Sequence, residues 1–578
     1  MHSHNNFILP VLLQILLLPA ATAKCYPPGA TFPIPDYSLV PPPNIKLPAS
    51  ADAPWPTNTT SYAVEVTAAE KTIFSAYHTA DILGEYLDGE PSNVTGDTYF
   101  RIASNTKVFT VLAVMLTEGM SLDDSILKYI PELMDGEGGV EWEDVTLGAL
   151  GGHFGGIVRE YAAFDLFGHG DEGDLLKDPV SHGFPPLPRS AGPPCGITEG
   201  DVPCTWKQFT SGFSARRPVY PPQAIATYCN AGFMLLSLSL ERHTKTSFEK
   251  IVQDKILTPL NLTSTFYKPR DSAGVIPHGR NDWSWNEGIK NAAGGLYASS
   301  TDLSKFLRSL LNHGAGLGGV GMTRGRMNGW LKGGSRTGSP WSEYGTPWEV
   351  VYSDTLAPDG HVVSVITKGG ALKGYFSTII ILPDYGLAAN VLVSGAATAD
   401  RYLRDSIIEQ LVPWAHSHAL SQATTFTGIY SALPTTGINT TITLTTTPNL
   451  PGLGVETFIS NGTDMKAFAA SYYQDYADIL TPGEVDFRLF PTGIGKVWRM
   501  SVNFIPHEKK QETVWSRACF TDIDVWAYAG QSVSEFIFHE GEEKAVVVGV
   551  GLPAFRISLA KQEGQKEEEE EEVHGELR

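Results

Sequence analysis

The sequence predicts an α/β (α+β) fold: an antiparallel sheet flanked by helices, followed by a smaller C-terminal all-β domain. Three observations lead to this prediction. The segment Ser104–Glu118 has helical character and is apolar on nearly every side, which is typical of a central buried helix. The segments 361–367, 375–382 and 387–393 are strand-like and joined by tight turns, so we expect adjacent antiparallel strands. Strand-like stretches with Gly and Asn turns dominate from residue 424 to residue 559.

The composition is that of a folded protein with a full core. The chain has 578 residues, of which 42% are hydrophobic and 18% charged, and this excludes a disordered chain, a collagen-like repeat and a coiled coil. Its 63 acidic residues outnumber the 42 basic ones, giving a formal net charge of -21. A nucleic-acid binder needs a basic surface that displaces counterions from phosphate, so we expect no nucleic-acid partner.

The chain divides into five segments by composition. They are a signal peptide at 1–23, an extended Pro-rich lead-in at 24–60, an α/β domain at 61–420, a β-rich domain at 421–560 and an acidic disordered tail at 561–578. Within the α/β domain, the further elements expected are strands at 62–66 and 72–76 and helices at 231–242, 247–256, 301–312 and 400–414.

The first residues have the pattern of a secretory signal. Residues Phe7–Leu18 are apolar apart from Gln14, and Ala21-Thr22-Ala23 matches a small-residue cleavage site. The apolar stretch is too short for a membrane-spanning helix, which needs about 20 apolar residues, and no later segment reaches that length uninterrupted. We therefore expect a secreted protein with no membrane partner.

The five cysteines fit an oxidising compartment. Cys195 and Cys204 bracket a loop that contains Gly and Pro, and we expect them to form a disulfide. Cys229 lies at the entrance of an apolar segment, where a small buried thiol is the simpler interpretation. Cys25 and Cys519 are then left, and could tie the two ends of the chain together. Five Asn-x-Ser/Thr sequons allow glycosylation, at Asn58, Asn93, Asn261, Asn439 and Asn461.

The strongest chemical motif is Ser104-Asn105-Thr106-Lys107, at the start of the predicted buried helix. Residues three apart on a helix share a face, and a partly desolvated lysine can accept a proton from a serine hydroxyl near neutral pH. The spacing alone does not decide the matter, because serine is also a favoured helix N-cap and the same spacing recurs. It recurs at Ser125/Lys128, Ser247/Lys250 and Ser558/Lys561.

Two further motifs stand downstream. Tyr228-Cys229-Asn230 precedes a second apolar helix. A tyrosine beside a lysine can relay a proton and an Asn amide can donate to a substrate carbonyl, although a buried Tyr with a turn Asn would look the same. The segment Lys368–Ala371 (Lys-Gly-Gly-Ala) ends a predicted strand. Its glycines either let a substrate backbone approach the strand edge or simply form a turn.

In the order Ser-x-x-Lys, Tyr-x-Asn and Lys-x-Gly, these motifs resemble the serine β-lactamase and penicillin-binding-protein superfamily, and its class C-like branch in particular. That branch also contains D-stereospecific peptidases, esterases and acyltransferases. The resemblance covers most of residues 60–415, including the segments 100–107 and 152–156. It implies a β-lactamase/transpeptidase-like fold with a helical subdomain. The late β domain resembles the lipocalin-like appendage of several family members, a layout shared by secreted fungal β-lactamase-like proteins.

The resemblance implies that three side chains carry the chemistry. Ser104 would be the nucleophile and Lys107 its activating partner. Tyr228 would relay protons in acylation and deacylation.

The resemblance also implies four substrate-binding residues, Asn230, Lys368, Gly370 and Ala371. Asn230 would orient the substrate carbonyl, and Lys368 would supply positive charge beside the relay. The backbone N–H groups of Ser104 and Ala371 would form the oxyanion hole.

One position departs from the family pattern. The third motif commonly reads Lys-Thr-Gly or Lys-Ser-Gly, and its hydroxyl helps to hold the carboxylate of a β-lactam or a terminal peptide. Gly369 stands in that place and has no hydroxyl. A site without this donor recognises a free carboxylate less well, which favours an ester, an amide or another acyl donor. The expected partner is therefore a small-molecule or peptide acyl substrate.

The expected function is that of a secreted serine hydrolase that works through an acyl-serine intermediate and needs no cofactor. An acyltransferase acting on a small metabolite through the same acyl-enzyme is one alternative, and a non-catalytic secreted binding protein with a relic site is another. Neither Gly-x-Ser-x-Gly nor His-Glu-x-x-His occurs in the sequence, and the histidine spacing suggests no metal site. The sequence carries no signal for an oligomeric state.

Overall fold

The computed structural model describes residues 25–48, 52–83, 93–163, 165, 179–196, 202–269, 274–476, 483–506, 518–519, 523–541 and 546–562. The predicted signal peptide and the acidic tail beyond residue 562 lie outside these residues. The chain forms two compact units. The larger unit is Ile34–Ala419, and the second unit consists of the chain from Leu420 onward together with the segment before Ile34. The prediction of an α/β fold followed by a β-rich domain is confirmed.

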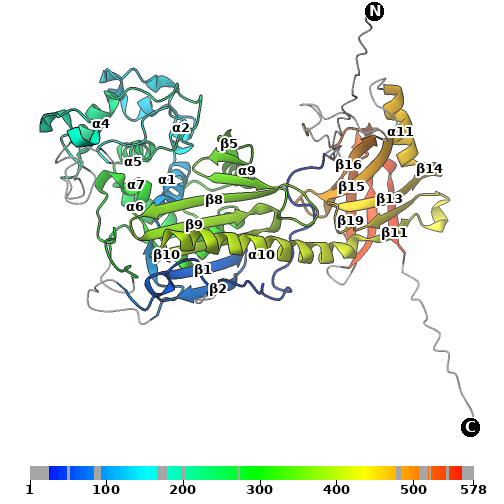
Figure 1. Ribbon diagram of the computed structural model, residues 1–578. Coiled ribbons are helices and arrows are strands. Elements are labelled where there is room, and N and C mark those ends of the chain that lie inside the picture. Colours follow the sequence, from blue (N-terminus) through cyan, green and yellow to red (C-terminus); the bar gives the residue numbers. More distant parts are fainter. Residues whose placement is uncertain are drawn as a thin grey trace, which may run out of the picture. The chain divides into compact units, whose positions relative to one another are not determined.

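An eight-stranded antiparallel sheet is the centre of the larger unit (Figure 1), in the order β2-β1-β10-β9-β8-β7-β6-β5. In that order the strands are Thr72–His78, Ser61–Ala68, Leu387–Ser394, Tyr375–Leu382, Val363–Leu372, Glu349–Ser353, Ser342–Gly345 and Gly333–Arg336. Strands β8, β9 and β10 are the three predicted from the closely spaced segments, and they are neighbours because two tight turns connect them.

Strand β8 is longer than its sequence predicts. The predicted strand ends at Thr367, before the Lys-Gly-Gly-Ala segment, but β8 continues to Leu372. Glycine weakens a strand when taken alone. Here the pairing of Gly369 and Gly370 with Thr378 and Ser377 of β9 holds the backbone extended. The motif therefore lies within a strand and not in a turn.

Most helices of this unit come from the chain between β2 and β7. They are α1 Thr106–Met115, α2 Leu147–Gly151, α4 Trp206–Ser214, α5 Ala231–Thr244, α6 Phe248–Val252, α7 Asn291–Gly294, α8 Ser300–Leu311 and α9 Arg324–Trp330. A short ladder of β3 (Tyr99–Arg101) and β4 (Tyr297–Ser299) lies beside them. The long helix α10, Ala397–Ala423, follows β10.

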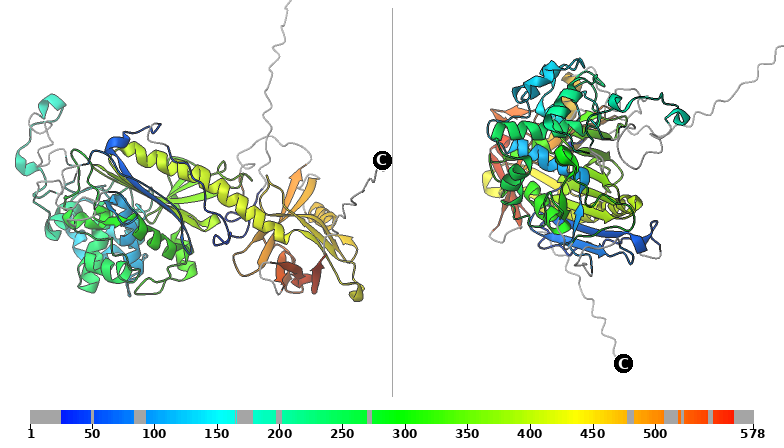
Figure 2. Two further views of the ribbon diagram at one scale, coloured as in Figure 1. Left: turned by 90° about the horizontal axis from the view of Figure 1, so that it is seen from below. Right: turned by 90° about the vertical axis from the view of Figure 1, so that its left-hand side faces the viewer.

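The two faces of the sheet are covered by different helices. Alternating apolar residues on one face pack against α10, which runs along the strands (Figures 1 and 2). The members of this cluster include Val64, Val391 and Val393 of the sheet and Leu403, Ile407 and Leu411 of α10. The opposite face packs against α8, which crosses β1 and β10, and against the 3-10 turn Ala103–Asn105 at β8 and β9. The central strands β9 and β10 are therefore buried on both sides.

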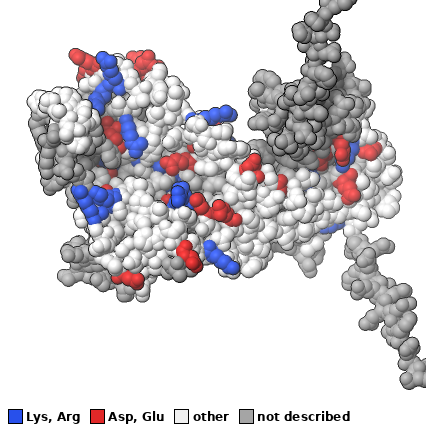
Figure 3. All heavy atoms as spheres, in the orientation of Figure 1, with Lys and Arg blue, Asp and Glu red and all other residues white. Residues whose placement is uncertain are grey.

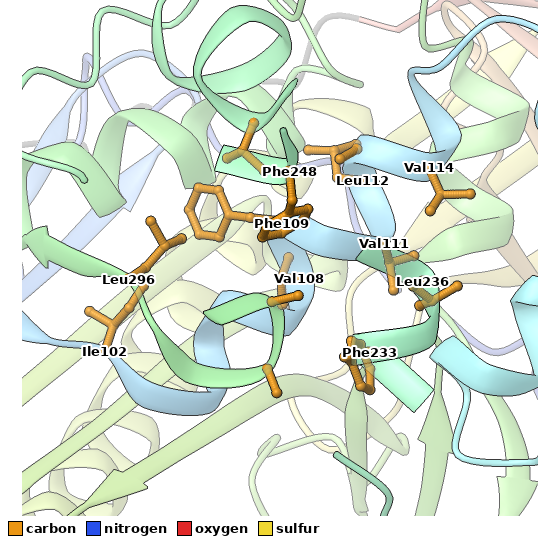
Figure 4. Close-up of a cluster of buried hydrophobic side chains, with 14 of the residues drawn as sticks. Ile102, Val108, Phe109, Val111, Leu112, Val114, Phe233, Leu236, Phe248 and Leu296 are labelled. Atoms are coloured by element: carbon orange, nitrogen blue, oxygen red, sulfur yellow. The ribbon is translucent and has the colours of Figure 1, made fainter. Parts of the chain in front are cut away.

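Helix α1 has no polar face because it lies inside the helical layer, as its sequence predicts. It packs against α5 and α7, and the ring of Phe109 stacks on Phe306 of α8 at 4.4 Å between centroids. Figure 4 shows its apolar side chains among those of α5, α6 and the segment before β4. The helix begins two residues later than predicted, because residues Ala103–Asn105 form a 3-10 turn.

The predicted extended lead-in has no long helix or strand among its described residues, and part of it packs onto the larger unit. The ring of Tyr37 stacks on Trp414 of α10 at 5.6 Å, and its hydroxyl donates to the carbonyl of Tyr385 at 2.7 Å. Trp55 lies 6.4 Å from Tyr402 of the same helix. These aromatic contacts explain why a segment without periodicity is ordered.

The second unit is a closed eight-stranded antiparallel barrel. Its order is β12-β11-β21-β20-β19-β16-β15-β13, and pairing of β12 with β13 closes it. In that order the strands are Thr441–Thr445, Gly428–Ser431, Ile557–Lys561, Val547–Leu552, Glu535–Glu540, Val497–Pro506, Gly483–Pro491 and Leu453–Ser460. The short β14 (Thr463–Asp464) extends β13, and the helix α11 (Met465–Tyr476) is an addition that the sequence did not predict. Closure leaves no free edge between the barrel strands.

The disulfides join Cys195 to Cys204 and Cys25 to Cys519, and Cys229 is a buried thiol. The Cys25–Cys519 bond lies within the second unit and ties the segment before Ile34 to the barrel domain. All five sequon asparagines are exposed. Acidic and basic side chains are interspersed on the face shown in Figure 3. Among the described residues, no helix is both long enough and apolar enough to cross a bilayer.

Candidate active site

The turn that carries Ser104 is held in a strained conformation. Ala103 has a positive φ of 45°, which is rare for a residue with a side chain and is common at functional sites. The Asn105 amide donates to the Ser377 hydroxyl at 2.8 Å, and that hydroxyl donates to the Ile102 carbonyl at 2.8 Å. Sequence reasoning missed Asn105 and Ser377. Together they fix the turn, while Ser104 itself remains partly exposed.

Lys107 lies directly against Ser104. Its Nζ is 2.9 Å from the Ser104 Oγ and donates at 2.7 Å to the Ala293 carbonyl, which belongs to α7. The lysine is fully buried. Burial lowers the pKa of its ammonium group, and the nearby positive charge of Lys368 lowers the pKa further, while Tyr228 opposes both effects. A lysine in this environment can accept a proton from the serine hydroxyl.

Tyr228 reaches the same point from the loop before α5. The Nζ atoms of Lys107 and Lys368 lie 5.2 and 5.1 Å from the centroid of its ring. Burial would raise the pKa of this phenol, but the two lysine charges and the Ser104 hydroxyl lower it to about 8. Roughly a tenth of the phenol is then ionised at pH 7, far more than for an ordinary tyrosine.

His153 positions the tyrosine. Its ring stacks on Tyr228 at 4.4 Å between centroids, and its Nδ1 accepts a hydrogen bond from the Cys229 backbone N–H at 3.1 Å. Burial and the charges of Lys368 and Lys107 lower the pKa of His153 well below its usual range, so the ring is neutral. The sequence contained a signal for this contact, since residues 152–156 stand where the resembled family often has a His-Thr-Ser-Gly turn.

Lys368 is fully buried and pairs with Glu349, a residue that sequence reasoning missed. The Lys368 Nζ lies 2.7 Å from Glu349 Oε1, and the Gly369 N–H donates to Glu349 Oε2 at 3.0 Å. Burial alone would lower the pKa of Lys368, but Tyr228 and Glu349 raise it. Glu349 stands at the start of β7, the neighbour of β8, and only strand pairing reveals it.

Gly370 lets β8 pass close to the serine turn. A Cβ atom at this position would lie 2.4 Å from the Ile102 carbonyl oxygen and 3.0 Å from the Ser104 nitrogen. Only glycine fits there without moving the backbone. A Cβ atom at Gly369 would meet Glu349 alone, at 3.4 Å.

The edge of β8 beside the serine is open. Strand β7 pairs with β8 only as far as Thr367, and the Gly369 N–H faces this edge, where Glu349 accepts its hydrogen bond. Backbone N–H groups alternate along a strand, so the Ala371 N–H faces the same edge. An oxyanion hole made of the Ser104 and Ala371 N–H groups remains a prediction.

Asn230 is placed differently from the expected role. It is the N-cap residue of α5 but makes no side-chain capping hydrogen bond; its amide donates a short hydrogen bond to Glu160, whose other oxygen lies 3.9 Å from Lys290. The Asn230 side chain is only 7% exposed. The structure thus places it beside the site but engages it with a carboxylate, and its contact with a substrate carbonyl remains a prediction.

A family comparison agrees with the fold. Residues 56–412 match the family described as Beta-lactamase, which covers more than half of the chain. The chain belongs to the β-lactamase family. Residues 419–563 match a second family, described as "Beta-lactamase-like-like, C-terminal domain".

Three fungal proteins are similar along nearly the whole length. The chain is 27% identical to the "Probable hydrolase M10" of a Phoma species, covering 96% of this chain and 95% of that protein. It is 27% identical to the "Probable hydrolase clz13" of Cochliobolus lunatus, with the same coverage. It is 25% identical to a "Beta-lactamase-like protein" of Arthroderma benhamiae, covering 94% of this chain and 96% of that protein.

Proposed function

We propose that this β-lactamase family member is a secreted serine hydrolase that cleaves neutral esters or amides through an acyl-serine intermediate. The observation that carries the proposal is the contact between a fully buried lysine and a partly exposed serine hydroxyl, 2.9 Å apart. Two of the similar fungal proteins are described as probable hydrolases, which supports the reaction class.

In the proposed reaction, the Ser104 Oγ attacks the carbonyl carbon of the substrate, and its proton passes by way of the Lys107 amine to the Tyr228 phenolate. The new C–O bond turns the carbonyl oxygen into an oxyanion, which accepts from the Ser104 and Ala371 N–H groups. Collapse breaks the bond to the leaving alkoxide or amine, which takes up the proton. Loss of one such donor costs about 10²–10³ in rate in comparable sites.

Deacylation follows the same path in reverse. The Tyr228 phenolate takes a proton from a water molecule, which attacks the acyl-serine carbon, and Ser104 leaves as an alkoxide that is reprotonated. The positive charges of Lys107 and Lys368 lower the pKa of Tyr228 and so support the phenolate. An alcohol or amine acceptor in place of water would make the same intermediate an acyl donor.

The substrate is proposed to be neutral at the end that lies near Gly369. The missing hydroxyl at Gly369 is one reason to expect a neutral substrate, and Glu349 is a second. Its carboxylate occupies both the Lys368 ammonium and the Gly369 N–H, the two groups nearest to that position. A substrate carboxylate would have to displace it and would meet its negative charge.

Secretion is supported by the two disulfides and by the exposure of the five sequon asparagines. Glycosylated protein in the medium of an expressing eukaryotic culture, shortened by a glycosidase, is the expected result. Retention of the whole product inside the cells would contradict it.

A fluorophosphonate probe tests the nucleophile. We expect wild-type protein to gain one covalent adduct in its intact mass and Ser104→Ala to gain none. Ser558→Ala is the matched control, because Ser558 has the same Ser-x-x-Lys spacing on an exposed strand position. Equal labelling of wild type and Ser104→Ala would overturn the proposal. Turnover of p-nitrophenyl esters, D-amino acid amides and nitrocefin then tests the substrate class, with nitrocefin expected to be the slowest.

A further inference from the structure

A second buried polar cluster lies on the other face of the sheet. Asp359 and His361 belong to the loop before β8, Asp384 to the turn between β9 and β10, and His416 to α10. All four are at least nine-tenths buried, among the apolar side chains that pack α10 against the sheet. None of them is used by the proposed reaction.

Three of the four side chains converge, and Asp384 faces one of them, His361. The His361 Nδ1 lies 2.5 Å from Asp359 Oδ1, and its Nε2 lies 3.9 Å from Asp384 Oδ2. The His416 Nε2 lies 3.9 Å from Asp359 Oδ2. Asp359, His361 and His416 each offer one ligand atom, and these three atoms lie within 4.8 Å of one another. Tyr385 contacts the other ring nitrogen of His416 at 3.3 Å, which turns Nε2 toward the cluster.

Two atoms of the cluster are buried without a hydrogen bond. Among the described residues, neither His361 Nε2 nor Asp384 Oδ2 has a hydrogen-bond partner, although they face each other. A buried polar atom without a partner is costly, and native structures rarely keep one.

We propose that Asp359, His361 and His416 form a structural site for a divalent cation of the zinc type, with Asp384 as the hydrogen-bond partner of the His361 Nε2. Two imidazoles with a carboxylate suit Zn²⁺, with water as a fourth ligand, whereas Ca²⁺ and Mg²⁺ prefer oxygen ligands alone. Ligand atoms around tetrahedral zinc are about 3.3–3.5 Å apart, so on binding the 2.5 Å between His361 and Asp359 must lengthen and the 3.9 Å between His416 and Asp359 must shorten. The cation would offset the charge of the buried carboxylates and join the β8 loop to α10, and Asp384 would connect the β9–β10 turn to the site through His361.

The histidine spacing gave no sign of this site because His361 and His416 are far apart in the sequence. The sheet and α10 bring them together. The alternative occupant of the cluster is a proton on Asp384, which would leave a hydrogen-bonded Asp–His network without a metal.

Metal titration of the full chain distinguishes a bound cation from a protonated Asp384. After removal of metals with a chelator and dialysis, we expect the protein to bind one equivalent of Zn²⁺ and to melt about 5 °C higher or more when it is bound. With Co²⁺ we expect the intense visible absorption of a tetrahedral centre. Uptake well below one equivalent, or a Co²⁺ spectrum of octahedral intensity, would overturn the proposal.

Variants locate the binding. Asp384→Asn and His416→Gln should each weaken Zn²⁺ binding more than about tenfold, whereas His418→Gln, two residues further along α10, should bind like wild type. Unchanged binding by both Asp384→Asn and His416→Gln would also overturn the proposal. Should these variants fail to fold, the Co²⁺ spectrum of the wild type decides on its own.

Discussion

The Ser104 site and the Asp359 cluster occupy opposite faces of one sheet, and both bury charged groups that water would otherwise stabilise. At the Ser104 site the buried charges are positive, and Lys107 is forced toward its neutral, basic form. In the Asp359 cluster the carboxylates are in excess over fixed positive charge. The same cost of burial thus favours a proton acceptor in one place and a cation site in the other, and the sign of the charge decides which.

Replacing Lys107 by Met should have the largest effect on activity. A small effect would contradict the comparison of the two buried sites. We expect ester hydrolysis to fall about 10³–10⁴-fold, because the hydroxyl loses its nearest base. Lys250→Met is the matched control, since Lys250 has the same spacing from a serine and is 63% exposed. Initial rates with a p-nitrophenyl ester measure both. A loss of less than tenfold for Lys107→Met would mean that the contact with Ser104 is incidental.

Gly370→Ala should lower the rate by about 10²–10³, because the added methyl group displaces the Ser104 N–H or the Ile102 carbonyl. Gly369→Ala is the matched control, since its methyl group meets only Glu349 at an ordinary distance. The same ester assay measures the pair. Equal effects of the two variants would mean that the close approach of β8 to the serine turn does not matter for catalysis.

Glu349→Gln should have two smaller effects, one on the pH profile and one on the substrate preference. Removing the negative charge lowers the pKa of Tyr228 further, so the rise of activity with pH should begin at lower pH. The rate ratio of a carboxylate-bearing substrate to a neutral one should increase, on the order of tenfold, since repulsion is removed. Glu343→Gln, on the neighbouring β6, is the control. An unchanged pH profile and an unchanged ratio would exclude Glu349 from the site.

Metal removal should have the smallest effect on activity. We expect the chelated wild type to hydrolyse esters at 25 °C within about twofold of the untreated protein while melting at a lower temperature. Parallel rate and melting measurements test this. Loss of the ester activity together with the metal would mean that the two faces of the sheet are not independent.

Much of the fold and part of the candidate site could be predicted from the sequence, because local periodicity determines them. Ser104 and Lys107 are three residues apart, across the 3-10 turn and the start of α1, so their contact is local in the sequence. The sequence did not predict that β8 continues past Thr367, because Gly369 and Gly370 weaken a strand that β9 nevertheless holds in place. Glu349 was missed because its partner Lys368 lies on an adjacent strand, and pairing between strands is not a local property.

The Asp359 cluster, on the other face of the sheet, is a stronger example of contacts that the sequence does not predict. His361 and His416 meet only because α10 folds back over the sheet, and nothing near either residue indicates the other. Contacts that depend on such packing follow from the topology and not from motif spacing.

The pH dependence of Ser104 acylation tests the central claim most directly. The rate of adduct formation with a neutral fluorophosphonate, followed by intact mass, should increase with pH and level off above an apparent pKa near 8, because the phenolate is the active form. In Tyr228→Phe the rate should be about 10²–10⁴-fold lower and this step should vanish. An identical pH profile in Tyr228→Phe would contradict the account, since the proton would then leave Ser104 without the phenol.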